Sequence, residues 1–130
     1  MLLLWPRNKA GRRALATVSL LFLALWLAGM TAAISGAGCA KPRIKDERRL
    51  RLCNLSLAMP VPPEPQKRAR IYLERGIIHA RVGDDAQALA DFRCAMTDAG
   101  PYPFWLAQLD ARMEPETGAA AQIWAGIRRR

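Results

Sequence analysis

The chain has 130 residues and a formal net charge of +9, enough for one small domain with additional segments. The charge is uneven, because residues 1–13 hold four basic residues and no acid, whereas residues 41–130 hold sixteen basic and eleven acidic residues. Nearly half of the excess therefore lies in a basic amino-terminal segment, 1–13, and the rest is a moderate surface charge that argues against nucleic acid as a partner. Binding to nucleic acid would also require residues 41–130 to be cytoplasmic, and it would fall steeply with salt.

Neither catalysis nor a metal site finds support in the sequence. It contains no GxSxG, HExxH or Walker A motif. The single histidine, His79, and three cysteines, none in a CxxC pair, do not supply the four closely spaced ligands of a zinc site. We therefore expect a protein that is not an enzyme and that binds no cofactor.

Residues 14–38 are predicted to form a transmembrane anchor or signal region. No charged side chain occurs in residues 14–40, and residues 14–34 are almost wholly apolar. About twenty apolar residues cross a bilayer as a helix, whereas the apolar region of a signal peptide has about 7–15. The preceding basic cluster favours a cytoplasmic N-terminus, which would place the rest of the chain in a bacterial periplasm. Basic residues from Lys41 to Arg51 follow the apolar run closely, so this rule alone leaves the orientation open.

The residues before Cys39 resemble the lipobox of bacterial lipoproteins. The small residues Ser35-Gly36-Ala37-Gly38 precede the cysteine that would be lipidated, although that family usually has leucine at the position of Gly36. Three fates of the segment remain open, namely an uncleaved anchor, a lipoprotein lipidated at Cys39, and ordinary secretion. If Cys39 is lipidated or removed, Cys53 and Cys94 remain as a candidate disulfide pair in an oxidising compartment. The alternative is that both are small apolar side chains buried on helices.

After residue 40 the sequence predicts helices joined by short connections. A juxtamembrane segment, 39–65, contains a helix over 44–59, and the prolines of 60–65 end this helix because proline lacks an N–H donor and clashes with the preceding turn. A helical domain follows over 66–130, and its first helix is expected over 68–81, where apolar residues recur at helical spacing.

The turn after this helix carries clear capping residues. Gly83 suits the left-handed position that ends a helix. Asp84 is expected to cap the next helix, with Gln87 completing a capping box, and this helix should extend to about Asp98. Two helices joined by so short a turn must pack antiparallel. Two weaker helices are expected over 104–113 and 116–127.

Residues 69–101 resemble one tetratricopeptide repeat, a helix–turn–helix unit of 34 residues. The matching positions are the first aromatic residue, the small residue of the first helix, and the small–large–small series of the second helix, occupied by Tyr72, Gly76, Ala88, Phe92 and Ala95. Arg75 and His79 depart from the family pattern. The resemblance implies an all-α fold, a short solenoid of antiparallel helix pairs, with a partial repeat at 44–59 and a degenerate one at 102–128. In this arrangement Gly76 and Ala88 let paired helices approach, and Phe92 fills the groove between them.

The tetratricopeptide family binds peptides or helices along a concave surface. The resemblance therefore implies that the residues facing a partner are Tyr72, Arg75, His79, Trp105 and Gln108. About two and a half repeats fall short of the roughly three that usually give stability, so a protein or peptide partner, or a second copy, is expected to cover an open face. We expect a membrane-tethered protein-interaction module, and the alternative is a structural accessory subunit of a larger membrane complex.

Overall fold

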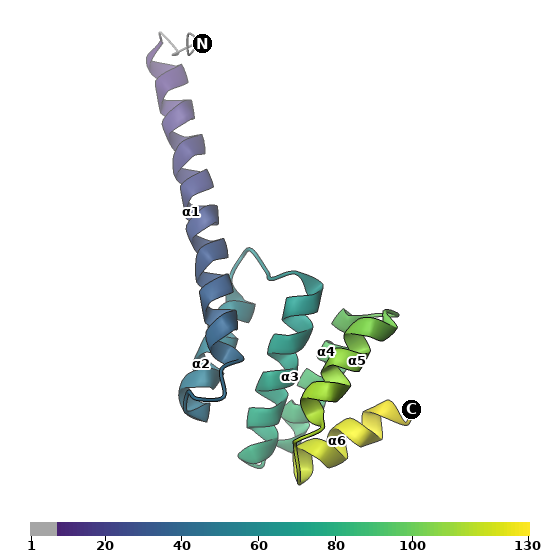
Figure 1. Ribbon diagram of the computed structural model, residues 1–130. Helices are drawn as coiled ribbons and strands as arrows, with labels where there is room; N and C mark the ends of the chain where they lie inside the picture. Colours follow the sequence, from purple (N-terminus) through teal and green to yellow (C-terminus); the bar gives the residue numbers. More distant parts are fainter. Residues whose placement is uncertain (1–7) are drawn as a thin grey trace.

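The computed structural model describes residues 8–130, so residues 1–7 of the predicted basic segment lie outside the described part. Across residues 8–130 the chain forms six α-helices and no strand, which confirms the all-α fold class (Figure 1). The helices are α1 (Lys9–Cys39), α2 (Asp46–Ala58), α3 (Pro65–Arg81), α4 (Asp85–Ala99), α5 (Pro103–Met113) and α6 (Ala119–Arg128).

Helix α1 stands out from the other helices as one continuous helix of 31 residues (Figure 1). The side chain of Asn8 caps it by accepting a hydrogen bond of 2.9 Å from the Gly11 N–H. Most of its apolar side chains are exposed, for example Val18 at 63% and Phe22 at 73%. By length and composition this helix can serve as a membrane anchor or a signal sequence.

Helix α1 begins five residues before the predicted apolar segment, and from α2 onward the boundaries lie within two residues of the predicted ones except at two starts. Helix α3 begins at Pro65, three residues before the predicted start, because proline is favoured in the first helical turn, where its missing N–H costs nothing. Helix α6 begins at Ala119 and not at Glu116. Gly118, directly before it, has a positive φ of 71°, which is incompatible with a helix running through this residue.

The turn between α3 and α4 has the predicted glycine in the left-handed region, with φ of 86° at Gly83. The Gly83 N–H donates to the Ala80 carbonyl at 3.2 Å, and the Asp84 N–H donates to the His79 carbonyl at 2.9 Å. These two bonds make a Schellman turn. The Asp84 side chain caps α4 by accepting from the Gln87 N–H at 3.2 Å. The second bond of the predicted capping box would run from the Asp84 N–H to the Gln87 side chain. The Asp84 N–H instead donates to the His79 carbonyl.

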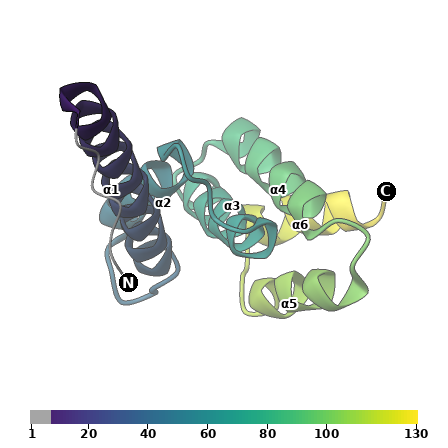
Figure 2. The same ribbon diagram turned by 90° about the horizontal axis from the view of Figure 1, so that it is seen from above.

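Helices α3 and α4 pack antiparallel, as predicted, around a fully buried aromatic side chain (Figure 2). Phe92 of α4 lies against Gly76 of α3, where a Cβ atom would come within 2.6 Å of its ring. Ala88 and Ala95 are also fully buried. The roles predicted for the small residues and for Phe92 within this pair agree with the packing.

The helices on either side of this pair differ from the predicted repeats. The helix predicted over 44–59 has a full antiparallel partner, because the carboxyl-terminal part of α1 packs along α2. Helices α5 and α6 do not repeat the α3–α4 arrangement, since α6 packs mainly against α4 and α3 (Figure 2). Trp124 of α6 meets the Phe92 ring edge-on, with 5.7 Å between ring centroids.

Candidate functional site

Small residues let the end of α1 approach α2 and α3 closely. The Ser56 hydroxyl of α2 donates to the Ala32 carbonyl of α1 at 2.8 Å. A Cβ atom on Gly36 would lie 2.9 Å from the Ile71 side chain, and one on Gly38 would lie 2.7 Å from Leu52. Gly36 and Gly38, two of the small residues that resemble a lipobox, therefore lie at close helix contacts, where a methyl group would displace the end of a neighbouring side chain.

The structure pairs Cys39 with Cys53 in a disulfide, and both cysteines are fully buried. The candidate pair of Cys53 with Cys94, which depended on lipidation or removal of Cys39, does not form, and Cys53 and Cys94 are not two buried free thiols either, because Cys53 is bonded and Cys94 is free and exposed. The sulfur of Cys39 is bonded to Cys53 and so is not free to carry a lipid in this arrangement of the full chain. The bond ties the end of the long helix to the helical domain.

Alkylation of the unfolded, unreduced chain should modify one of the three cysteines, Cys94, and all three after reduction. Reduction should also lower the free energy of unfolding by about 3 kcal/mol, because the bond closes a loop between residues 14 apart. Peptide mass mapping and urea unfolding in detergent measure the two effects. Modification of Cys39 without reductant would contradict the pairing, and Cys94→Ser is the control, which should change neither the bond nor the stability.

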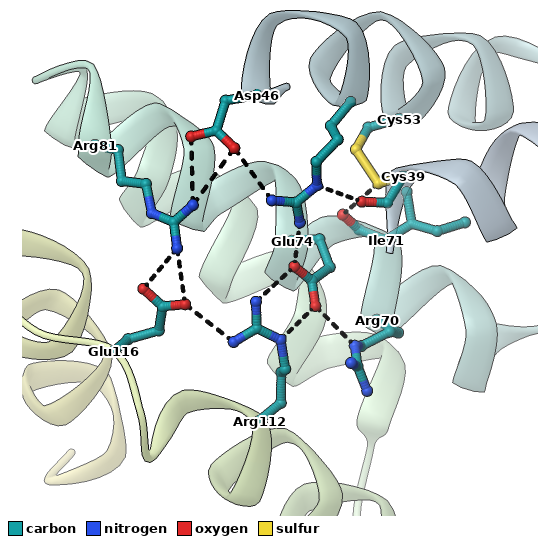
Figure 3. Close-up of polar contacts among 10 residues, drawn as sticks. Cys39, Asp46, Cys53, Arg70, Ile71, Glu74, Arg81, Arg112 and Glu116 are labelled. Carbon is teal, nitrogen blue, oxygen red and sulfur yellow. Dashed lines mark hydrogen bonds and ion pairs between the residues drawn. A yellow bond between two sulfur atoms is a disulfide. The ribbon is translucent and has the colours of Figure 1, made fainter. Parts of the chain in front are cut away.

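A buried carboxylate joins three helices beside this disulfide (Figure 3). Glu74 of α3 is fully buried and accepts hydrogen bonds from Arg49 of α2 at 2.6 Å and from Arg112 of α5 at 2.6 Å. Arg70, one turn earlier on α3, adds a bond of 3.0 Å. Arg49, only 1% exposed, also donates to the Cys39 carbonyl at 3.0 Å, where a cation complements the end of the α1 dipole.

Three further residues extend this cluster toward the surface. Arg81 contacts Asp46 at 3.3 Å and Glu116 at 3.1 Å, and Arg112 contacts Glu116 at 3.0 Å. Every buried side-chain nitrogen and oxygen within residues 8–130 has a hydrogen-bond partner. Nothing in the sequence marks Arg49 as internal, since it stands in a run of arginines that is typical of a basic surface. The cluster is therefore a structural joint between helices.

Acidification should weaken this joint at Glu116. Burial raises the pKa of Glu116, but hydrogen bonds from Arg112 and Arg81, together with their charges, outweigh burial and hold the pKa below its ordinary value. A carboxylate with a lowered pKa in the folded state contributes stability above its unfolded pKa, and this contribution disappears as pH falls through the folded pKa. Urea unfolding from pH 7 to pH 3 should therefore show a smaller acid-induced loss for Glu116→Gln than for wild type. Equal losses would contradict the role of Glu116.

Three of the five predicted partner residues lie on α3 beside α4. Arg75 makes two bonds to Asp91, of 2.6 and 2.9 Å, and these bonds raise the pKa of Arg75. His79 lies 3.8 Å from the same carboxylate. Tyr72 lines a shallow depression of about 320 Å³ together with Leu57 of α2 and residues of α3, α4 and the α2–α3 connection. The side chains of Arg75 and His79 thus point toward Asp91 of α4 within the domain.

The other two predicted partner residues come from α5, which contributes no residue to this depression. Trp105 is half-buried against the core and contacts the ring of Tyr102, and Gln108 is exposed. The five residues therefore do not form one continuous groove. Whether any of them binds a partner stays a prediction.

An open apolar groove of about 540 Å³ lies between α4 and α6, and it was not predicted from the sequence. Its floor is formed by apolar side chains and glycine, namely Ala86, Leu89, Ile123, Gly126 and Ile127. Arg93 and Arg130 stand at its rim together with Asp85. The signal was present in the sequence, because Leu89 and the apolar face of α6 lie at helical spacing. The crossing of α6 over α4, which brings the two faces together, has no sequence signal.

Within residues 8–130 no group of three histidine, cysteine or acidic residues could hold a metal ion. The groove between α4 and α6 is a candidate surface for recognition, and its lining contains no residue of the buried ionic cluster or the disulfide. Its apolar floor and basic rim indicate the kind of ligand that it could bind. No protein-family model, curated protein or solved structure matches this sequence.

Proposed function

We propose that the chain is a membrane-anchored, non-catalytic interaction module that binds a segment of another protein in the groove between α4 and α6. The observation that carries the proposal is the groove itself, whose floor is apolar and whose volume of about 540 Å³ falls in the range of ligand sites. The antiparallel α3–α4 pair, which resembles a tetratricopeptide repeat, supplies one wall of this site.

The charges at the rim favour an acidic partner. Neither Arg93 nor Arg130 pairs with an acidic side chain among residues 8–130, in contrast to the arginines of the buried cluster. Asp85 is the one acid on the rim, so the rim carries an excess of positive charge. Complementary charge speeds association and rejects wrong partners. The expected partner segment therefore places an apolar side chain, such as leucine or phenylalanine, next to aspartate or glutamate.

The anchoring part of the proposal rests on α1 and the disulfide. Helix α1 exposes its apolar side chains and begins in a segment rich in basic residues, which favours a cytoplasmic N-terminus. A structural disulfide is typical of oxidising compartments. Cys39 and Cys53 form their bond beyond the apolar part of the helix. Both features support a helical domain outside the cytoplasm, in a periplasm if the source is bacterial.

Affinity purification of the full-length tagged protein from mild detergent tests the proposal. The wild type should retain a partner that Leu89→Glu loses, because a carboxylate would lie on the apolar floor. The matched control is Val82→Glu, which alters an exposed apolar side chain in the α3–α4 turn, outside the groove. Arg93→Glu should weaken binding and reduce its dependence on salt.

The outcomes separate the module from an accessory subunit. Equal retention of all partners by wild type and Leu89→Glu would contradict a binding role for the groove. Co-purification of membrane proteins in constant proportion, unaffected by Leu89→Glu, would instead support a subunit held through α1. Circular dichroism of each variant in detergent establishes that loss of binding is not loss of fold.

A further inference from the structure

The helical domain packs along α1 at a depth that a membrane-spanning helix would place inside the bilayer. The apolar run begins at Ala14, and about twenty residues at 1.5 Å each are needed to cross the hydrocarbon, which extends the span to about Ala33. Val61, in the connection between α2 and α3, lies beside Gly29, with 3.8 Å between its Cγ1 and the position of a Cβ there. Gly29 is four residues, or about 6 Å, inside the end of the span. The connection that holds Val61 must therefore enter the membrane boundary with α1.

The composition of this connection suits such a position. Residues 59–63 read Met59-Pro60-Val61-Pro62-Pro63, and no charged side chain occurs from Leu52 to Pro63. Irregular backbone is costly in lipid because unpaired N–H and C=O groups lose their hydrogen bonds to water. Proline has no N–H, so three of these five residues bring no donor that would need a partner. Val61 is 37% exposed and available for contact with lipid.

A second apolar connection lies at the same end of the domain. Because α3 runs away from the α2–α3 connection and α4 returns antiparallel, the connection between α4 and α5 comes back to this end (Figure 1). It reads Gly100-Pro101-Tyr102 and continues with Pro103-Phe104 at the start of α5. Tyr102 is 56% exposed and Phe104 is 68% exposed. Aromatic rings, and tyrosine in particular, are enriched at the boundary between membrane and water.

The connections at the opposite end of the domain are charged. The α1–α2 connection has three basic residues, Lys41, Arg43 and Lys45. The α3–α4 turn has one acidic residue, Asp84, and the α5–α6 connection has two, Glu114 and Glu116. At the end that faces the span, the α2–α3 connection holds one charged residue, Glu64, directly before α3, and the α4–α5 connection holds none. Apolar side chains exposed to water do not stabilise the fold. The difference in charge between the two ends therefore indicates that one end contacts lipid and the other contacts water.

A groove of about 280 Å³ between α1 and α3 lies next to the α2–α3 connection. Its apolar floor and basic rim are complementary to the acyl chains and the phosphate of a phospholipid. Small apolar residues of α1, such as Ala33 and Ala37, form its floor together with Ile71. Lys67 and Arg70 stand at its rim. Long basic side chains reach from an apolar surface toward lipid phosphates, so this rim suits anionic headgroups.

We infer that the end of the domain formed by residues 59–63 and 100–104 rests in the interface of the bilayer that α1 crosses. The inference depends on the proposed anchoring by α1. It extends the proposal, because contact at two connections fixes the orientation of the domain relative to the membrane. The α4–α6 groove is then held at a defined height and angle above the lipid surface, and the domain does not swing on a flexible tether.

A polarity-sensitive fluorophore attached to single cysteines tests this inference in the full-length protein. The background is Cys94→Ser, which leaves no other free thiol, and the labelled positions are Val61→Cys, Phe104→Cys, Leu21→Cys in the span and Thr117→Cys at the charged end. The proteins are reconstituted in vesicles of phosphatidylcholine and phosphatidylglycerol. Quenching by lipids with a shallow or a deep nitroxide gives the depth of each label, and aqueous iodide gives its exposure to water.

Labels at residues 61 and 104 should be quenched several-fold more by the shallow nitroxide lipid than the label at residue 117, which iodide should quench instead. The label at residue 21 should respond to the deep nitroxide. If the labels at residues 61 and 104 were quenched like the label at residue 117, while the label at residue 21 lay deep in the bilayer, the inference would be overturned. The proposed anchoring by α1 would not be affected. A water-exposed label at 21 would overturn both. Circular dichroism and melting of each labelled protein in detergent identify any variant that has lost its fold.

Discussion

Glu74→Gln should lower the free energy of unfolding by about 3–5 kcal/mol, the cost of removing one partner from a buried ion pair. The carboxylate is fully buried and faces arginines from α2, α3 and α5. Glutamine keeps the size of the side chain and removes the charge. Arg49, which is 1% exposed, would then hold a positive charge away from water without its closest anion. Urea unfolding of the full chain in detergent, followed by helical circular dichroism, measures this loss.

The matched control is Glu47→Gln on α2, which makes the same chemical change at an exposed ion pair with Arg51. Exposed pairs of this kind contribute about 0–1 kcal/mol, because water screens them and two long side chains must be ordered. A loss for Glu74→Gln no larger than that for Glu47→Gln would contradict the role of the cluster. A large difference would establish that α2, α3 and α5 are held together through this one carboxylate.

Gly76→Ala should destabilise the fold by about 1–3 kcal/mol, although alanine is the better helix former. The added Cβ would come within 2.6 Å of the Phe92 ring, which is fully buried and held edge-on by Trp124. The ring has little room to move, so the helices or the ring must shift. The matched control is Gly126→Ala in α6, where a Cβ would meet no atom within 4 Å. That variant should be neutral or more stable by up to about 1 kcal/mol.

A double-mutant cycle with Phe92→Ala isolates this contact. Phe92→Ala alone should cost about 3–5 kcal/mol, because it empties the space between α3 and α4. In that background Gly76→Ala should cost less, since the ring is gone and the nearest remaining atom is the Ala88 carbonyl oxygen at 3.3 Å, a tight contact that a small shift relieves. Unfolding free energies of the four proteins give the coupling. Equal costs of Gly76→Ala in both backgrounds would show that the ring is not the obstacle.

Much of the local structure could be predicted from the sequence because local rules decide it. The apolar run of residues 14–34 and the prolines after residue 59 set the long helix and the break that follows α2. Gly83 and Asp84 define the turn between α3 and α4, and the spacing of Gly76 and Phe92 sets their packing. Each of these signals acts within one helix or across one short turn, so a single stretch of sequence contains it.

Contacts between distant segments were decided only in the tertiary structure. The cysteine pairing depended on the close approach of α1 and α2, which brings Cys39 and not Cys94 to Cys53. Arg49 belongs to a run of arginines in the sequence, and its burial follows from Glu74, 25 residues later. The groove between α4 and α6 exists because α6 packs across α4. Local propensity and spacing determine the helices, whereas ionic pairing, disulfide formation and grooves depend on which faces meet, and that is set by the packing of all the helices together.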